Sequence, residues 1–336
     1  MTTIDDIASE CRVSRTAVSQ VLNGKDRKLS AATRERIRDT MRRLNYRPSA
    51  KGRALSTGRS NTIGVVTKMQ SHLLAMPYFA DIVSAVLDGA TEAEMTMALF
   101  NGSVWSKSDP QRLLFADGRC DGLIVIGAWQ LEGLVDGLIR AGIPFVAVNS
   151  GELPDGCASI DIDNVEAGRA ATRHLVSLGR KRIAYCHDEE DSAFSRQRCD
   201  GYAQALHEAH IPVEDNLIIG CLPGVNSYGK GLLAASINPP IDAVFCAGDQ
   251  VALSVMQAIR DSGMLVPDDV AVVGVNGESC GAVSVPSLTT VSQRLFDLGT
   301  EAVRMLLAMI ENPSAGKQLV WPTELIIRSS TTKEGS

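Results

Sequence analysis

The sequence predicts a small all-α helix-turn-helix domain at the N-terminus, followed by an α/β domain whose two lobes are each built on a doubly wound parallel sheet. Three observations support this fold class. Apolar residues recur at helical spacing in three short segments of residues 1–47. From residue 61 onward, strand-like apolar runs alternate with helical stretches. The charge also divides there: residues 1–60 carry 14 Lys and Arg against 6 Asp and Glu, and residues 61–336 carry 19 against 33.

Residues 1–47 are predicted to fold as three short helices, with a tight link between the first two. Ser14 is a good N-cap for the second helix and Ser30 for the third, and Pro48 is expected to end the third. This arrangement predicts a helix-turn-helix motif. The apolar stripes at helical spacing are Ile4, Ile7, Ala8 and Cys11, then Ala17, Val18, Val21 and Leu22, and then Ile37, Met41 and Leu44.

The second helix, within VSRTAVSQVLNG (Val13–Gly24), has a polar side opposite its apolar one. In a helix-turn-helix motif this helix lies in the major groove of DNA, with its N-terminal residues on base edges. Because residues 1–60 are basic, we predict that double-stranded DNA is the partner of this polar side. The alternative is a solvated face on a small helical bundle. The predicted DNA contacts are Ser14, Arg15, Thr16, Ser19, Gln20 and Asn23.

Residues 48–60 are predicted to link the two domains. They could form one or two helical turns, basic through Lys51 and Arg53, with Leu55 as the only large apolar residue. So short a helix is marginal in water, and Gly52 destabilises it by a further ~1 kcal/mol relative to alanine. We therefore expect order in this segment only when another surface holds it.

Residues 61–336 are predicted to contain two series of strands, one for each lobe. Ligands of this fold class bind at the carboxyl ends of the strands, so the cleft between the lobes is the predicted ligand site. The first series comprises Thr62–Thr67, Thr96–Phe100, Gly122–Ile126 and Pro144–Val148, with helices at Phe79–Ala93 and Leu131–Ala141. The second comprises Arg182–Cys186, Leu217–Ile219, Ala243–Ala247 and Val270–Val275, and Thr323–Ile327 is the last predicted strand.

Composition narrows the classes of function. No apolar run approaches the roughly 18–20 residues that a membrane span needs. The start, MTTIDDIASE, lacks the basic and then apolar pattern of a signal peptide, so we expect a cytoplasmic protein without a membrane partner. The eight cysteines contain no C-x-x-C pair and lie mostly in apolar runs. This pattern predicts buried, reduced thiols, with no metal and no cofactor.

Three alternatives compete with a DNA-binding protein. GESCG (Gly277–Gly281) has the G-x-S-x-G form of a hydrolase nucleophile elbow, but all five histidines precede Ser279, and such enzymes need the order Ser, acid, His. GKGLLA (Gly229–Ala234) imitates a dinucleotide fingerprint without a preceding strand. We therefore predict that the chain is not an enzyme. A small-molecule receptor that binds no DNA would explain the two lobes but not residues 1–60.

Five segments, taken in order, are typical of one protein family. They are TIDDIASECRVSRTAVSQVLNG, NYRPSAKGRAL, HLVSLGRKRIAY, DAVFCAGDQVALSVMQAIRDSGMLVPDDVAVVGVNG and VPSLTTVSQRLFDLGTEAVRMLL. On these segments the chain resembles the lac repressor (LacI/GalR) family of bacterial transcription regulators over essentially its whole length. The resemblance implies a helix-turn-helix domain at 1–47, a hinge helix at 48–60, and a two-lobed effector-binding and dimerisation domain at 61–336, similar to periplasmic sugar-binding proteins.

The resemblance also implies a mechanism. A homodimeric repressor binds a pseudo-palindromic operator, and its paired hinge helices enter the minor groove, where Leu55 would wedge into a base step. A small effector, a sugar or a sugar-derived metabolite, binds between the lobes and controls DNA binding. No leucine-heptad tail follows the last strand, so we expect a dimer rather than a tetramer.

The family pattern also assigns an effector site. Arg198, in SRQRCDGY, takes the place of an arginine that holds hydroxyls or carboxylates. Aspartates frequent in the family are replaced by amides, and an aromatic platform is replaced by leucine, so a smaller or anionic ligand becomes plausible beside a neutral sugar. We expect Asp249 to be the N-cap of a helix over Val251–Asp261, and Asp188–Asp191 to be a solvated loop. The assigned residues are Tyr78, Phe79, Asn149, Asp163, Arg198, Leu222, Gly248, Asn276 and Gln293.

Overall fold

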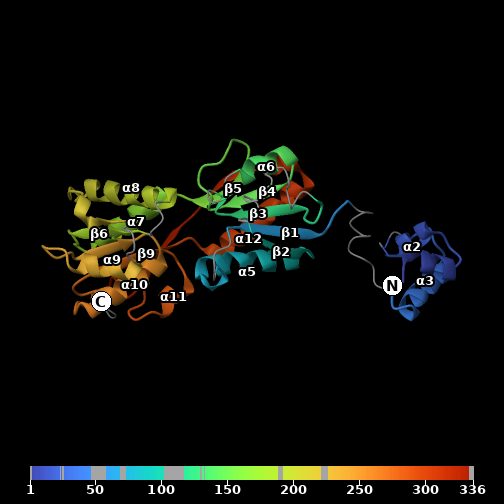
Figure 1. The fold of residues 1–336 in the computed structure, drawn as a ribbon, viewed down its shortest axis with the longest axis horizontal. Coiled ribbons are helices and arrows are strands. Elements are labelled where there is room, and N and C mark those ends of the chain that lie inside the picture. The colour runs from blue at the N-terminus through green and yellow to red at the C-terminus, as the bar shows by residue number, and fades with distance from the viewer. Residues whose placement is uncertain are drawn as a thin grey trace. The chain divides into compact units, whose positions relative to one another are not determined.

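The computed structural model describes residues 2–22, 24, 26–46, 58–68, 73–101, 117–128, 131, 133–187, 192–220 and 226–332 of the chain. They fall into two compact units, Met1–Asn61 and Thr62–Ser336 (Figure 1).

The N-terminal unit is a cluster of three helices, α1 (Ile4–Glu10), α2 (Arg15–Leu22) and α3 (Ala31–Arg43). Ser14 Oγ accepts a hydrogen bond from the backbone N–H of Ala17, and Ser30 Oγ caps α3 in the same way, as predicted. Helix α3 ends before Pro48, because Asn45 adopts a left-handed backbone (φ 46°) and turns the chain out of the helix. The predicted apolar stripes meet in one core built on Ile7, Ala8, Cys11, Val18, Val21 and Ile37.

Lobe 1 of the second unit is a parallel six-stranded sheet in the order β11-β5-β4-β3-β1-β2. Helices α5 (Pro77–Glu92), α6 (Leu134–Ala141) and α12 (Leu295–Glu311) cover it, together with the short η1 (Leu73–Ala75) and η5 (Pro313–Ala315). The strands are β1 (Thr62–Thr67), β2 (Thr96–Asn101), β3 (Gly122–Ile126), β4 (Phe145–Val148), β5 (Ala158–Ile162) and β11 (Gln318–Trp321).

Lobe 2 has a sheet in the order β12-β10-β9-β8-β6-β7, parallel except for the β10–β12 pair. Its strands are β6 (Ile183–Cys186), β7 (Ile218–Ile219), β8 (Ala243–Cys246), β9 (Ala271–Asn276), β10 (Thr289–Ser292) and β12 (Glu324–Ile326). Its helices are α7 (Asn164–Ser177), α8 (Ala193–Glu208), α9 (Ser227–Ala235), α10 (Asp249–Asp261) and α11 (Ser279–Val283), with the short η4 (Asp215–Leu217).

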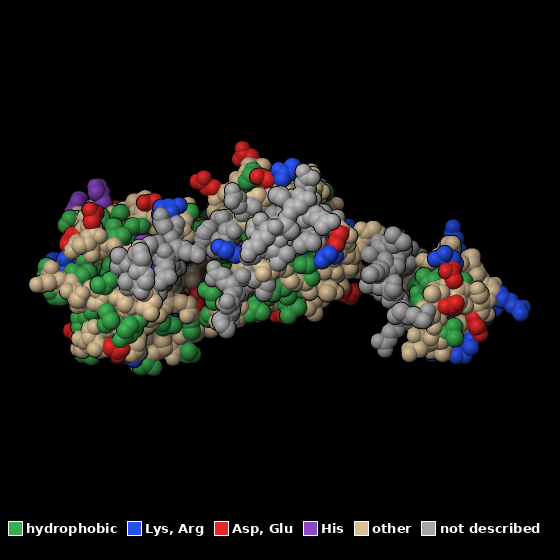
Figure 2. Space-filling view, viewed as in Figure 1, with side chains coloured by type: hydrophobic (Ala, Val, Ile, Leu, Met, Phe, Trp, Pro, Cys, Tyr) green, Lys and Arg blue, Asp and Glu red, His purple; other side chains and the backbone are tan. Residues whose placement is uncertain are grey.

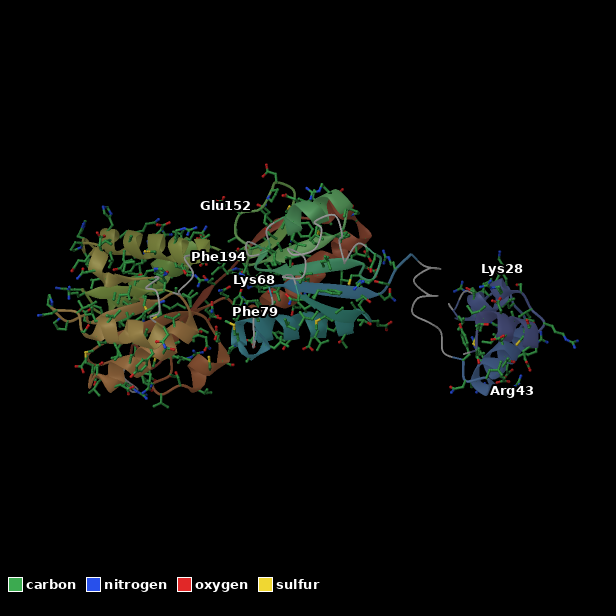
Figure 3. All side chains as sticks on the ribbon, viewed as in Figure 1. Lys28, Arg43, Lys68, Phe79, Glu152 and Phe194 are labelled. Carbon is green, nitrogen blue, oxygen red and sulfur yellow. The ribbon has the colours of Figure 1, made fainter. Side chains whose placement is uncertain are left out.

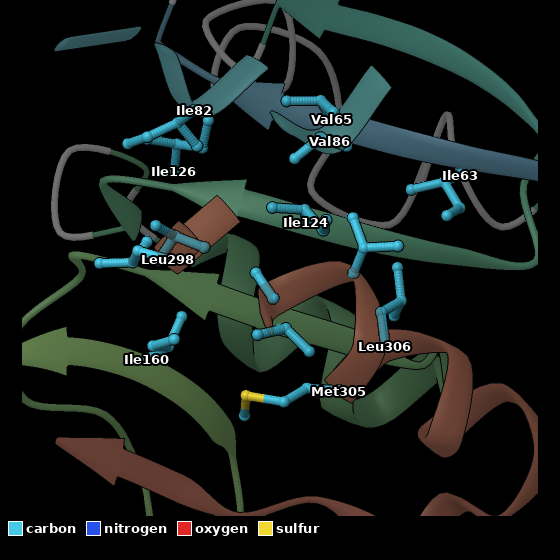
Figure 4. Close-up of a cluster of buried hydrophobic side chains, with 14 of the residues drawn as sticks. Ile63, Val65, Ile82, Val86, Ile124, Ile126, Ile160, Leu298, Met305 and Leu306 are labelled. Carbon is cyan, nitrogen blue, oxygen red and sulfur yellow. The ribbon is translucent and has the colours of Figure 1, made fainter. Parts of the chain in front are cut away.

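The chain passes between the lobes after β5, after β10 and between β11 and β12. The second passage carries α12 back under the sheet of lobe 1, where Leu298, Met305 and Leu306 pack against Ile63 and Ile124 (Figure 4). These crossings place the ends of several strands beside one another at the boundary of the lobes.

The predicted strands are all present within one or two residues of their expected bounds, which confirms the two series. Three strands were not predicted: β5, β10 and β11. Helix α6 is shorter than expected, since it begins only after Gly133, which adopts a left-handed backbone (φ 72°).

Candidate functional site

The polar side of α2 is exposed above a buried apolar side. Arg15 and Thr16 are exposed and Ser19 and Gln20 are half-buried, whereas Ala17, Val18 and Val21 are buried. Arg15 Nε lies 2.9 Å from the Asp5 carboxylate of α1, yet its side chain is 72% exposed. The ion pair therefore leaves most of the Arg15 side chain exposed to solvent.

The segment after α2 is fixed to α3 through Asp26. This carboxylate is buried, and it lies 3.2 Å from Arg38 Nη2 and 3.7 Å from Arg34 Nη1. Arg and Lys side chains, among them Lys28 and Arg43, project from the surface of the N-terminal unit (Figures 2 and 3). Of the predicted DNA contacts, Asn23, Lys51, Arg53 and Leu55 lie outside the described residues.

At the boundary of the lobes, polar side chains form one chain of hydrogen bonds, here called the amide line. It runs through Tyr78, Asn149, Gln293, Asn276 and Glu278. Asn149 follows β4 in lobe 1, and its Nδ2 donates to Tyr78 Oη and, at 3.0 Å, to Gln293 Oε1. Gln293 Nε2 donates to Asn276 Oδ1 at the end of β9 (2.8 Å). Asn276 Nδ2 in turn donates to Glu278 Oε1 (3.0 Å). Four of the residues assigned to the effector site therefore lie together, as expected for strand ends.

Arg198 lies on α8 of lobe 2. Its Nε donates to Asn164 Oδ1 (2.9 Å) and its Nη1 to the backbone oxygen of Ala247, just after β8. Among the described residues no hydrogen bond engages its Nη2. Two hydrogen bonds thus fix the guanidinium, and the N–H groups of its Nη2 are left to bind a ligand.

Asp161 of β5 supplies the carboxylate at this boundary. Burial raises its pKa, while the backbone N–H groups of Gly151 and Ile162 and the charge of Arg198 oppose that rise. The Asp161 charge also acts on the Tyr78 hydroxyl, whose pKa is raised chiefly by burial. A carboxylate, a guanidinium and a phenol therefore share one electrostatic environment.

Comparison with known proteins gives the family. Residues 3–49 match the model for "Bacterial regulatory proteins, lacI family", and residues 172–331 match the "Periplasmic binding protein-like domain". The chain is 31% identical over 98% of both chains to the HTH-type transcriptional regulator CelR of Thermobifida fusca. It is 32% identical over 99% of both chains to the HTH-type transcriptional repressor PurR of Mannheimia succiniciproducens. The chain belongs to the lacI family.

Solved structures agree with this assignment. The lac repressor dimer bound to operator and the anti-inducer ONPF has a TM-score of 0.81 and 25% identity, over 98% of this chain and 99% of that one. The complex of the regulator CelR with cellobiose has a TM-score of 0.72 and 28% identity, over 98% of this chain and all of that one. This lacI family member is therefore a DNA-binding transcriptional regulator with a helix-turn-helix domain and a two-lobed α/β domain.

Several assigned residues lie where a lacI family effector site was predicted. Tyr78 and Phe79 begin α5, with their rings edge to face at 5.1 Å. A Cβ on Gly248 would lie 3.7 Å from Asn276 Nδ2, so Gly248 adjoins the amide line. Leu222 and the acidic run at 188–191 lie outside the described residues.

Asp163, another residue assigned to the effector site, lies between β5 and α7. Its carboxylate is exposed and accepts the backbone N–H of Glu166 at 2.8 Å, as the N-cap of α7. Strand β5 ends at Ile162 and α7 begins at Asn164, so Asp163 lies between them, and Asp161 is the carboxylate whose pKa the Arg198 charge lowers.

Phe194 and Glu278 were not predicted. Phe194 lies one helical turn before Arg198, and a Cβ on Gly151 of lobe 1 would lie 3.8 Å from its ring. Figure 3 shows Phe194 and Phe79 coming from different lobes toward their boundary. The i, i+4 spacing of Phe194 and Arg198 is a signal that could have identified the ring.

Asp249 is not the N-cap of α10, because Gly248 occupies that position without a side-chain bond. Asp249 is fully buried, and it accepts hydrogen bonds from Glu278 N (2.7 Å) and Thr290 Oγ1 (2.6 Å). Burial raises its pKa to about 7, and the neighbouring Glu278 charge adds to the rise. Asp249 therefore fixes the segment after β9 to lobe 2.

We expect Asp249→Asn to remove a pH dependence of stability. The folded pKa, about 7, lies above the usual aspartate pKa of 3.8, so the stability that this group contributes is complete below about pH 4 and is lost as pH rises through 7. Between pH 6 and pH 8 the unmodified protein should lose about 1.4 kcal/mol relative to the variant. Urea unfolding at both pH values measures the difference. Asp163→Asn, at an exposed carboxylate, should keep the original pH slope, and a slope that Asp249→Asn leaves unchanged would contradict the assignment.

The described part of the chain holds no helix long and apolar enough to cross a membrane. The described cysteines are free thiols, buried except for the half-buried Cys199 and Cys280. Within the same residues no group of three or more His, Cys, Asp or Glu side chains is arranged to hold a metal ion.

Proposed function

We propose that this regulator is a repressor that binds a pseudo-palindromic DNA operator as a homodimer and is controlled by a small metabolite between its lobes. The observation that carries the proposal is the exposed polar side of α2 on a buried apolar one, within the segment that matches the lacI family model. A solved lac repressor structure of this fold is a dimer bound to operator and anti-inducer. On this proposal the protein acts in the cytoplasm, as a transcription regulator and not as an enzyme.

We assign three functional regions. Residues 1–47 bind the major groove through Ser14, Arg15, Thr16, Ser19, Gln20 and Asn23, and residues 48–60 enter the minor groove through Lys51, Arg53 and Leu55. Residues 61–336 bind the effector and the second subunit.

Exposed apolar side chains support a dimer surface. Val283 and Val285, at the end of α11 and after it, are 81% and 78% exposed, and Leu87 of α5 and Leu74 of η1 are about half exposed. Helices α5 and α11 lie along the same edge of the second unit in Figure 1. Burial of these side chains against a second copy would remove their apolar surface from water.

The effector site favours a ligand with both hydroxyls and an acidic or strongly accepting group. Arg198 offers donors suited to a carboxylate or phosphate, whereas Asn149, Asn276 and Gln293 offer neutral amides. The solved CelR structure is a complex with cellobiose, which supports a sugar or a sugar-derived metabolite as the effector of this chain.

The function is tested by selecting bound DNA from a random pool, followed by Arg15→Ala. Because the guanidinium fork can hold guanine O6 and N7 together, the variant should lose ~1–3 kcal/mol of affinity for the selected duplex and relax one position per half-site. Titrations of selected and random duplexes measure both effects.

Arg43→Ala is the matched control. Arg43 is exposed on α3 and pairs with Glu10, so its loss removes the same charge away from the polar side of α2. Arg43→Ala should weaken the binding of selected and random duplexes equally. An equal loss for Arg15→Ala would assign Arg15 to phosphate, and the absence of any selected sequence would favour a receptor that binds no DNA.

A further inference from the structure

The amide line between the lobes begins at the Glu278 carboxylate, which accepts every hydrogen bond that it makes with the described residues. Glu278 is buried, and its oxygens accept Asn276 Nδ2 (3.0 Å), Gln250 Nε2 (2.6 Å) and the more distant Cys280 Sγ (3.6 Å). An ionised carboxylate accepts hydrogen bonds and donates none. Asn276 must therefore turn its NH2 group toward Glu278 and its carbonyl oxygen away.

That orientation passes along the line, since each amide carries one oxygen and one NH2 group. The Asn276 oxygen requires a donor, so Gln293 presents Nε2 to it (2.8 Å). Gln293 then presents Oε1 to Asn149, which must donate through Nδ2 (3.0 Å). The second N–H of that group is directed to Tyr78 Oη. A carboxylate in lobe 2 thus determines which atom an amide presents in lobe 1.

The line ends on an unused acceptor. Asn149 is 6% exposed, and its Oδ1 is buried with no hydrogen-bond partner among the described residues. Asn149 and Asn276 both hold left-handed backbones, with φ of 45° and 126°. Such a conformation costs free energy unless the surroundings hold it, and here the amide bonds do so at both ends.

We propose that Glu278 is a positioning residue: it fixes the direction of the amide line so that Asn149 presents its carbonyl oxygen to the effector site. A ligand group that satisfies this oxygen must be a donor, either a hydroxyl or an N–H. The link to the effector rests on the proposed function, whereas the direction of the line does not.

The test reverses the donor-to-acceptor direction of the hydrogen bonds along the amide line. Asn149→Asp cannot donate, so two acceptors would face each other, and the midpoint of thermal unfolding should fall by about 4 °C or more at pH 8. Adding Glu278→Gln lets residue 278 donate to the Asn276 oxygen, and every amide can then turn over. The double variant should regain at least about half of the loss, relative to Glu278→Gln alone.

Two controls separate reversal from simple charge repulsion. Asp161→Asn also removes a carboxylate near this boundary, so equal rescue of Asn149→Asp by Asp161→Asn would overturn the proposal. Gln293→Met interrupts the line without adding charge, and in that background Glu278→Gln should no longer rescue Asn149→Asp. Persistent rescue there would show a through-space effect and overturn the proposal as well.

If Asn149→Asp fails to fold, the paired variants still decide the question. Asn149→Asp with Glu278→Gln should fold, whereas Asn149→Asp with Glu278→Asp, which keeps an acceptor-only group, should not. Equal behaviour of these pairs would contradict the proposal. Because the measurements contain neither DNA nor effector, their failure leaves the proposed function standing, and a failure of DNA binding leaves them unaffected.

Discussion

Gly168→Ala is expected to lower the free energy of unfolding by about 3 kcal/mol or more, although alanine is the better helix former. Gly168 lies on α7, and a Cβ there would overlap the backbone oxygen of Arg198 on α8. Likewise, a Cβ on Gly201 of α8 would overlap the backbone oxygen of Val165 on α7. Because both obstacles are backbone atoms, no rotamer change relieves the overlap, and the helices must separate.

The sign of the change in unfolding free energy distinguishes this steric overlap from helix propensity, because helix propensity alone predicts a gain of roughly 1 kcal/mol. Chemical denaturation of both single variants measures it. Gly168→Ala and Gly201→Ala should combine to less than the sum of their effects, since either one already separates the same two helices. Arg173→Ala, at an exposed site on α7, should change stability by less than about 1 kcal/mol. A more stable Gly168→Ala protein would contradict the close packing.

The glycine contact also explains how the sequence positions the effector site. Helix α7 begins with Asn164, whose Oδ1 accepts from Arg198 Nε, so the separation of α7 from α8 would move the guanidinium away from its partner. Packing in the interior of lobe 2 and the geometry of the proposed effector site at its edge therefore depend on the same pair of helices.

Local patterns predicted the N-terminal unit well because its helices have strong caps and regular apolar stripes. Ser14, Ser30 and the buried positions of α2 needed only short-range rules. Most strands of the second unit are continuous apolar runs, so they were also predictable. The end of α3 was not, since it depends on the left-handed backbone of Asn45 and not on proline.

The missed strands and site residues depend on tertiary contacts. Strand β5 carries Asp161 as its penultimate residue, which interrupts its apolar pattern. Strand β10 (Thr289–Ser292) is polar yet buried, because Asp249 hydrogen-bonds to one of its side chains and Ser330 to its backbone. Asp161 lies two residues before Asp163, which is the full period of a strand, and the family pattern singled out only Asp163. Glu278 gave no signal in the sequence, since its role comes from partners that the fold brings to it.

Arg198→Ala is expected to abolish the response to the effector while leaving the affinity for DNA at its effector-free value. Arg198 lies in the second unit, on α8. Its Nη2 has no hydrogen-bond partner among the described residues, and its charge makes it the strongest donor of the assigned residues. Loss of a charged hydrogen-bonding partner from a buried contact costs roughly 2–5 kcal/mol, which is a 30-fold to several thousand-fold weakening of effector binding. Calorimetric titration of effector, with and without the selected operator, measures this loss.

An effector controls DNA binding only if it binds the DNA-competent and DNA-incompetent states with different affinities, and that coupling is reciprocal. Operator must therefore change the effector affinity of the unmodified protein by the same factor by which effector changes its operator affinity. Arg198→Lys keeps the charge but not the fork, so its effector affinity should lie between the unmodified protein and Arg198→Ala. Arg173→Ala removes an exposed arginine of the same lobe and should respond normally. If Arg198→Ala responds as Arg173→Ala does, the metabolite binds elsewhere, and the assignment of the effector site to these strand ends is wrong.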